Sequence, residues 1–202
     1  MKIKYFGHSY LLIKGGDYSI ALDPYGEIGL NIPVVKADFV FSSHSHYDHN
    51  NFTAVKGAKI IEKSGGNFTI VPSFHDNEKG KLRGLNNILL FNLDGYRLAF
   101  MGDFGEDCNK QVIDALMGVD LLFIPVGGKY TIDSKTAKFY IGEIKPKAVI
   151  PMHYKIKGSN VDIKGVEEFL NLTSGSQKVN SPFEYNNEQG VIVVEPEIKG
   201  DL

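Results

Sequence analysis

The sequence predicts a layered α/β protein in which two β-sheets stack face to face and helices lie outside them. The first half of the 202-residue chain is rich in short apolar segments separated by turns. The second half alternates strand patterns with helix patterns. Residues with metal-binding side chains follow several of the predicted strands, and the ends of neighbouring strands meet at one edge of a sheet. Together these observations favour a two-sheet sandwich with a site at one edge.

The first half predicts an antiparallel meander followed by a hairpin. Gly15-Gly16-Asp17 marks an early turn, and Asp94-Gly95 is a hairpin turn between two apolar segments. A polar turn or short helix is expected over 51–55. Strands are expected over the ranges 3–6, 10–13, 18–22, 39–41, 58–62, 68–71, 88–91 and 96–101.

The second half predicts three helices. Val112, Ile113 and Leu116 recur at helical spacing, which favours a helix over 109–117. Asp133 or Ser134 is suited to cap the start of a second helix that runs to Glu143. The remaining elements are a helix over 166–172 and strands over 121–126, 148–150 and 191–194.

The composition is typical of one globular domain, and we expect a single domain over residues 1–202. The 43% hydrophobic content is enough for a substantial core, and the net charge of −2 gives no broad basic surface for nucleic acid. The lone Cys108 cannot form an intrachain disulfide, and Lys2 and Lys4 interrupt the apolar N-terminus. These features predict a protein of the cytoplasm. No apolar segment is long enough to span a bilayer.

The segment Ser43-His44-Ser45-His46-Tyr47-Asp48-His49 holds three of the six histidines of the chain. An unperturbed imidazole titrates near pH ~6.5, so such crowding without a metal would bring partly cationic rings together. His75, Asp103 and His153 each follow another predicted strand. Each of these three residues, taken alone, is compatible with an ordinary turn. Taken together with the cluster, they favour a metal site.

The cluster resembles the His-x-His-x-Asp-His signature of the metallo-β-lactamase superfamily, in which Asp23, His75, Asp103 and His153 would follow in the expected order. The resemblance implies a four-layer αββα sandwich. Within the superfamily, several further segments resemble predicted metal-dependent hydrolases related to ascorbate-6-phosphate lactonase. These segments are Gly7-His8-Ser9, His75-Asp76, Arg83-Gly84-Leu85-Asn86-Asn87, Gly102-Asp103, Pro125-Val126-Gly127-Gly128 and Pro151-Met152-His153-Tyr154.

The resemblance also implies a ligand set for two divalent metal ions. His44, His46 and His75 would hold one metal ion, and Asp48, His49 and His153 would hold the second. Asp103 would bridge the two ions, and Asp23 would orient a ligand imidazole from behind. Zinc is the first expectation, although imidazole and carboxylate ligands also accept manganese, iron or nickel.

Two such ions, roughly 3.5–4 Å apart, can share a hydroxide and polarise the bond that it attacks, which is hydrolysis. Asp48 and Asp103 would be the catalytic carboxylates, with Asp48 orienting the hydroxide. Two divalent ions, two carboxylates and one hydroxide leave one net positive charge. We therefore expect a small anionic ester, lactone or phosphoester as the substrate.

Two other functions stay open from the sequence. One is a phosphodiesterase acting on nucleotide or nucleic-acid diesters, although the chain has no long insertion between Asp103 and His153 to hold a nucleic acid. The other is a non-catalytic module that binds a metal or a partner. Structural metal sites are usually closed and mononuclear, which favours the enzyme.

Four residues outside the ligand set are candidates for substrate contacts: His8, Arg83, Lys129 and Tyr130. His8 is equally compatible with a hydrogen-bonded histidine in a turn, and Arg83 with a solvated charge. Gly127–Thr131 is equally compatible with a plain connecting loop. We expect a small-molecule substrate and no association with a membrane. The sequence is compatible with a monomer and with a homo-oligomer. It does not decide whether the loop Gly127–Thr131 is a lid.

Overall fold

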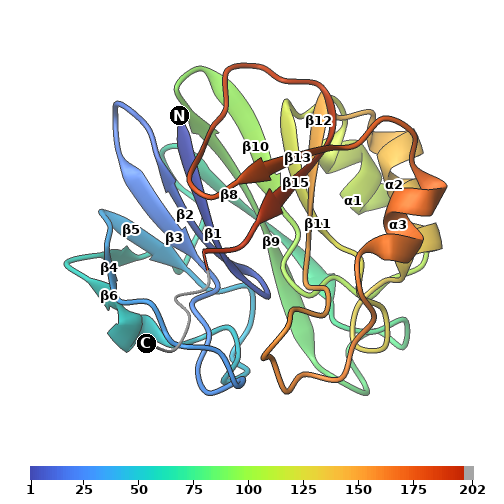
Figure 1. Ribbon diagram of the computed structural model, residues 1–202, viewed down its shortest axis with the longest axis horizontal. Coiled ribbons are helices and arrows are strands. Elements are labelled where there is room, and N and C mark those ends of the chain that lie inside the picture. Colours follow the sequence, from blue (N-terminus) through green and yellow to red (C-terminus); the bar gives the residue numbers. More distant parts are fainter. Residues whose placement is uncertain (198–202) are drawn as a thin grey trace.

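The computed structural model describes residues 1–197, so the last five residues of the predicted 1–202 domain lie outside the described part. Two sheets are stacked, as predicted (Figure 1). The first sheet has the strand order β14-β1-β2-β3-β5-β7. Its strands are β1 (Lys2–Gly7), β2 (Tyr10–Lys14), β3 (Ser19–Leu22), β5 (Phe39–Phe41), β7 (Lys59–Ile60) and β14 (Phe183–Glu184).

The second sheet has the order β13-β15-β12-β11-β10-β9-β8. Its strands are β8 (Phe68–Phe74), β9 (Leu85–Leu93), β10 (Tyr96–Phe100), β11 (Leu121–Pro125), β12 (Ala148–Met152), β13 (Gln177–Asn180) and β15 (Gly190–Glu195). Every residue of β11 and β12 is buried, as expected for parallel strands covered on both faces. A small third sheet pairs β4 (Val35–Lys36) with β6 (Val55–Lys56).

The three predicted helices are confirmed as α1 (Lys110–Leu116), α2 (Ser134–Ile144) and α3 (Glu167–Leu172). Asn109 and Asp133 cap α1 and α2 by accepting hydrogen bonds from Val112 N and Thr136 N. All three helices lie beside the second sheet (Figure 1). Between β1 and β7 of the first sheet, the structure has only the one-turn 3₁₀ helix η1 (Phe52–Ala54), so the helical layer expected there is reduced to one turn and loops.

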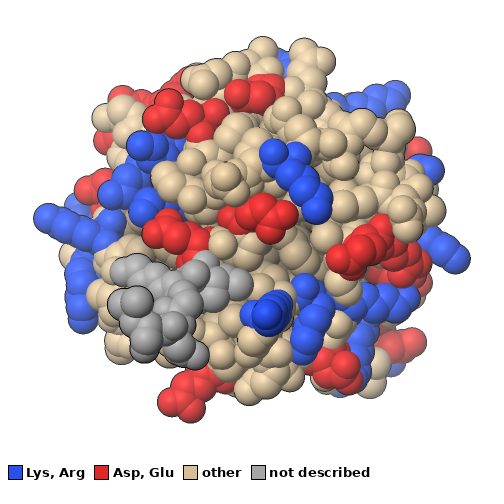
Figure 2. Space-filling model, viewed as in Figure 1, with Lys and Arg blue, Asp and Glu red and all other residues tan. Residues whose placement is uncertain are grey.

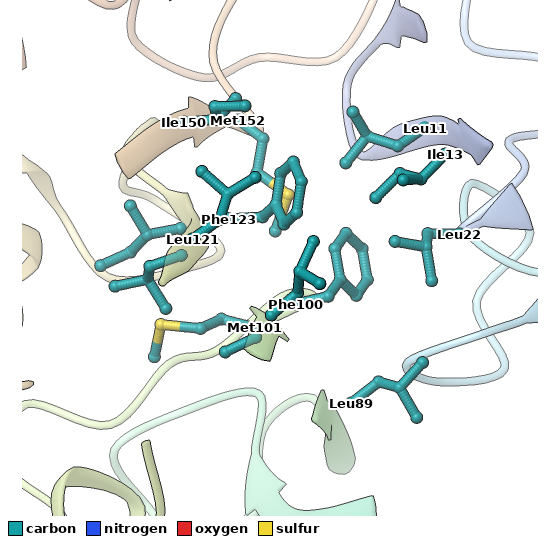
Figure 3. Packing of buried hydrophobic residues seen from close by; sticks show 14 of the residues in the cluster. Leu11, Ile13, Leu22, Leu89, Phe100, Met101, Leu121, Phe123, Ile150 and Met152 are labelled. Atoms are coloured by element: carbon teal, nitrogen blue, oxygen red, sulfur yellow. The ribbon is translucent and has the colours of Figure 1, made fainter. Parts of the chain in front are cut away.

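The main core fills the space between the two sheets (Figure 3). Leu11, Ile13 and Leu22 extend from the first sheet, and Phe100 and Phe123 extend from the second. All five side chains are fully buried. Each such side chain contributes about 1.5–3 kcal/mol through burial, so the core fixes the two sheets relative to each other.

Four strands are absent from the sequence expectations: β4, β6, β13 and β14. Three of them contain only two residues. The fourth, β13, contains no fully buried residue, so it lacks the alternating apolar pattern that identifies a strand. All four are defined by their pairing partners, which only the tertiary structure supplies.

The topology brings six segments to one edge of the sandwich. β3 and β5 run parallel in the first sheet, and β10, β11 and β12 run parallel in the second. β8 pairs antiparallel with β9, and β9 pairs antiparallel with β10, so β8 also points in this direction. The loops that follow β3, β5, β8, β10 and β12 therefore meet the β1–β2 turn at the same edge.

Lys and Arg side chains are interspersed with Asp and Glu on the face seen in Figure 2. That face thus carries no continuous basic surface. No helix in residues 1–197 combines the length and the apolar composition that crossing a membrane requires.

Candidate metal centre

His44, His46 and His75 form the first histidine group at this edge. Their ring nitrogens lie within 4.8 Å of one another, although His75 follows a strand of the other sheet. The Nδ1 atom of His44 is 2.9 Å from the Ser43 hydroxyl, which leaves Nε2 of His44 facing the other two rings. The structure thus brings these three predicted site residues together.

His8, His49 and His153 form a second group of the same size. The Nε2 atoms of His8 and His49 are 3.2 Å apart, and two nitrogens each about 2.0–2.1 Å from one zinc ion would have a similar separation. The Asp48 Oδ2 atom adjoins this group, 3.3 Å from His8 Nε2 and 3.7 Å from His49 Nε2. The sequence is compatible with His8 as a turn residue or as a pocket residue, and the structure places it beside His49 and His153.

Asp103 lies between the two groups. Its Oδ2 atom is 3.2 Å from His49 Nε2, 3.3 Å from His75 Nε2 and 3.1 Å from His153 Nε2. The carboxylate is buried. One oxygen therefore faces imidazoles of both groups, which is the position a bridging ligand would need.

These residues fit divalent metal ions. The Nε2 atom of His44 and the Oδ1 atom of Asp103 are buried and have no hydrogen-bond partner among residues 1–197. Such atoms are costly to bury unless something else binds them. Imidazole nitrogens and carboxylate oxygens are the donors by which proteins bind zinc and similar metals. A metal ion held by such residues can keep a coordination position for another ligand.

The electrostatics divide the histidines into two kinds. Burial, with His153 nearby, lowers the pKa of His8 to about 4, and burial together with His49 lowers the pKa of His44 to about 2. Burial would also lower the pKa of His49, but the carboxylates of Asp103 and Asp23 raise it well above its usual value. The rings of His8 and His44 are therefore neutral at pH 7, whereas the ring of His49 carries an extra proton in the metal-free protein.

Asp23 holds His49 from behind. Its Oδ2 atom is 2.7 Å from His49 Nδ1 and accepts a hydrogen bond of 2.6 Å from the Ser43 hydroxyl. Its Oδ1 atom accepts a second hydrogen bond, of 2.7 Å, from the Ser43 amide. The carboxylate thus fixes the orientation of the His49 ring, as expected of Asp23. The sequence analysis did not identify Ser43 as a supporting residue, although it contacts both Asp23 and His44.

Asn86 is a second supporting residue that the sequence analysis missed, since it was read only as part of a hairpin motif. Its side-chain oxygen accepts a hydrogen bond of 3.0 Å from the Asp103 amide, and its side-chain nitrogen donates to the carbonyl of Met101. Gly102, between Met101 and Asp103 in the chain, has a φ of +58°, and a Cβ atom at this position would lie 2.3 Å from the Ser43 Cβ. Only glycine lets the backbone approach this closely.

Three residues of the centre have a left-handed backbone: His8, Asp23 and His153, with φ of +54°, +43° and +52°. This conformation is uncommon for residues other than glycine and costs of order 1–3 kcal/mol each. The His153 amide donates a 2.7 Å hydrogen bond to the His8 carbonyl, which joins the two sheets at the site. Such conformations persist where surrounding contacts impose them, and they gather at functional sites.

A cavity of about 710 Å³ opens onto the centre. Five candidate metal-centre residues line its base: His46, Asp48, His75, Asp103 and His153. The remaining lining residues include Tyr47, Arg83, Tyr130, Asn160 and Asp162. The cavity thus brings Arg83 and Tyr130 to the centre, whereas Lys129 does not line it and pairs instead with Asp162.

Comparison with known proteins identifies the family of the chain. The family model of the β-lactamase superfamily domain matches residues 2–153, and the chain belongs to that superfamily. The match ends at His153, so it spans every residue of the two histidine groups.

Two curated relatives are named UPF0173 metal-dependent hydrolases. One, from Nanoarchaeum equitans, is 33% identical, and the match covers 76% of this chain and 84% of the relative. The other, from Archaeoglobus fulgidus, is 28% identical over 76% of this chain and 83% of its own. A crystal structure from Thermotoga maritima, described as belonging to the metallo-β-lactamase superfamily, has a TM-score of 0.80 at 30% identity and covers 97% of this chain and 99% of its own. The present chain is a metal-dependent hydrolase of the metallo-β-lactamase fold.

Binding of zinc should release about one proton per protein molecule at pH 7, because the raised pKa of His49 keeps its ring protonated until a metal replaces the proton on Nε2. Calorimetric titration of the metal-free protein in buffers of different ionisation enthalpy measures the number of protons. Binding heats that do not depend on the buffer would contradict this prediction.

Asp23→Asn should weaken zinc binding by about 10–100-fold, because a neutral amide accepts the Nδ1 proton of His49 less strongly than the carboxylate does. Competition with a chromophoric chelator measures the affinity. Asp38→Asn is a matched control, since the Asp38 carboxylate likewise accepts hydrogen bonds from the amide and hydroxyl of a serine, Ser19, but is exposed. Equal affinities of the two variants would show that Asp23 does not support the metal.

Proposed function

We propose that the protein is a binuclear metal-dependent hydrolase of small anionic esters, lactones or phosphoesters. His44, His46 and His75 would hold one divalent ion. His49 and His153, with Asp48, would hold the other, and His8 adjoins them. Asp103 would bridge the two ions. Zinc is the preferred ion, since the Thermotoga maritima relative is described as a candidate Zn-dependent hydrolase.

The observation that carries this proposal is the position of the Asp103 carboxylate. Its Oδ2 atom lies within 3.3 Å of imidazole nitrogens from both histidine groups. A carboxylate buried among several imidazoles, beside an open cavity, supports a two-metal site with room for a substrate.

Bound metal ions would supply activation of water at neutral pH and polarisation of the carbonyl or phosphoryl bond. The protein residues supply the remaining functions. Asp48 lines the cavity and its Oδ2 atom contacts His8, which supports a role for this carboxylate in orienting the attacking water. Burial would raise the pKa of Asp48, but the hydrogen bond from His8 lowers it below its usual value, so the group accepts hydrogen bonds at neutral pH.

The proposed preference for anionic substrates follows from the charge of the loaded centre. Two divalent ions exceed the charge of Asp48, Asp103 and one hydroxide by one unit, and a cavity wall contributes the cation Arg83. The resemblance of several motifs to ascorbate-6-phosphate lactonase and its relatives supports lactones in particular. We also retain the proposal of a cytoplasmic location, which the single exposed Cys108 supports.

The zinc-loaded protein should hydrolyse at least one of two model substrates, an activated phosphodiester or a lactone from a panel of anionic and neutral compounds. Asp103→Asn should reduce the rate by at least about 100-fold, because it removes the charge between the two groups. Initial rates and the zinc content of both proteins provide the measurement.

The outcome also separates the alternatives. Turnover of lactones that disappears in Asp103→Asn supports acyl-ester chemistry. Turnover of the phosphodiester alone favours a phosphodiesterase. If the loaded protein hydrolyses nothing, or if Asp103→Asn is as active as the natural protein, the binuclear hydrolase is rejected and a binding module is favoured.

A further inference from the structure

We propose that Arg83 anchors a second anionic group of the substrate, remote from the bond that is hydrolysed. The inference rests on the proposed hydrolase function and deepens it, because it predicts a substrate with two anionic ends or with one anionic end and a reacting ester. The ligand group is a carboxylate or a phosphate, since a guanidinium binds either through two parallel hydrogen bonds.

Arg83 is the cation of the cavity wall. Of the Lys and Arg residues between positions 1 and 197, it alone lines the cavity that opens onto the metal centre. In the same described part of the chain, its guanidinium makes no hydrogen bond or ion pair, and its contact is with the ring of Tyr130, at 5.7 Å from the centroid. A cation half-buried on an aromatic ring without an anionic partner is ready to bind one from the substrate.

The neighbouring charges do not neutralise Arg83. Asp162 lines the same cavity, but its carboxylate pairs with the ammonium group of Lys129. The carboxylates of Asp48 and Asp103 face the histidine groups. The charge of Lys129 is thereby neutralised by Asp162, whereas no acidic residue among positions 1–197 pairs with Arg83. This distinguishes two residues that the sequence offered as equivalent candidates.

The loop that carries Arg83 is built around one buried carboxylate. Asp76 Oδ1 accepts hydrogen bonds from the amides of Glu78 and Gly80, at 2.8 and 2.9 Å. Asp76 Oδ2 accepts hydrogen bonds from the amides of Leu82 and Arg83, at 3.0 and 2.7 Å. Each such charge-assisted bond is stronger than a neutral one, so together they fix the loop.

This construction links the anchor to the metal centre. Asp76 directly follows the candidate ligand His75, and the amide of His75 donates a 3.1 Å hydrogen bond to the carbonyl of Gly84. The backbone on both sides of Arg83 is therefore held relative to the ligand. Asp76 is a positioning residue, and Arg83 binds the second anionic group of the substrate. A fixed distance between the metal centre and the guanidinium would select substrates by the separation of their two polar ends.

Non-hydrolysable ligands test the anchor without requiring turnover. Calorimetry measures binding of the zinc-loaded protein to α,ω-dicarboxylates of four to eight carbons, to the monoamide of each, and to the corresponding phosphonocarboxylates. Each dicarboxylate and its monoamide differ in one terminal charge. For at least one chain length, the natural protein should bind the diacid about 10–100-fold more tightly than its monoamide. The phosphonate series shows which of the two anions is preferred.

Arg83→Gln should reduce this ratio to about one and leave the zinc content unchanged. Lys79→Gln is the matched control: Lys79 is an exposed cation in the same loop and does not line the cavity, so its removal should leave the ratio intact. Asp76→Asn should reduce the ratio partly, since two of the four amide contacts would face an amide nitrogen.

The proposal is overturned if no diacid or phosphonocarboxylate is preferred by the natural protein, or if Arg83→Gln retains the natural ratio. An equal loss in Lys79→Gln would indicate general charge attraction and would overturn it as well. The hydrolase proposal is tested separately by turnover and Asp103→Asn, so either inference can fail while the other stands.

Discussion

The structure of the site depends on the Asp103 carboxylate, which is buried and yet charged. Burial alone would raise the pKa of this group, but His153 and His49 hold it well below its usual value. The imidazoles in turn come from both sheets, so the charge can be accommodated only when the two sheets are stacked in one register. Breaking such a buried arrangement by removing one partner is far more costly than losing a surface ion pair. The core between the sheets and the electrostatics at their edge are thus two parts of one constraint.

A layer of supporting contacts converts this constraint into a defined geometry. Asp23 and Ser43 hold His49 and His44 on the first sheet, while Asn86 holds Asp103 on the second. The sheets are also joined at the site by backbone groups, because the amide of Asn87 donates to the Ser43 carbonyl at 2.8 Å. Ligands held in this way lose little freedom when a metal binds, which favours affinity and a single coordination geometry.

The outer wall of the cavity is formed by loops. The metal centre is built on strand ends, whereas Arg83 and Tyr130 lie on loops, where residues can change without disturbing the core. One fold can therefore retain its metal chemistry while loops alter the substrate. The loop at Arg83 is organised by the buried carboxylate of Asp76, which accepts hydrogen bonds from four of its backbone amides.

The sequence by itself determined the longer strands and the three helices, a cap for the second helix and the ligand candidates, because apolar periodicity, capping residues and dense His and Asp spacing are local signals. His44 to His49 are close in space because they are close in the chain. The tertiary structure alone decided that His8 joins His49 and His153, that Asn86 supports Asp103, and that, within residues 1–197, Lys129 has an ion-pair partner while Arg83 has none. These relations link residues up to 145 positions apart, from His8 to His153. They arise from the register of two stacked sheets, and no local pattern encodes that register.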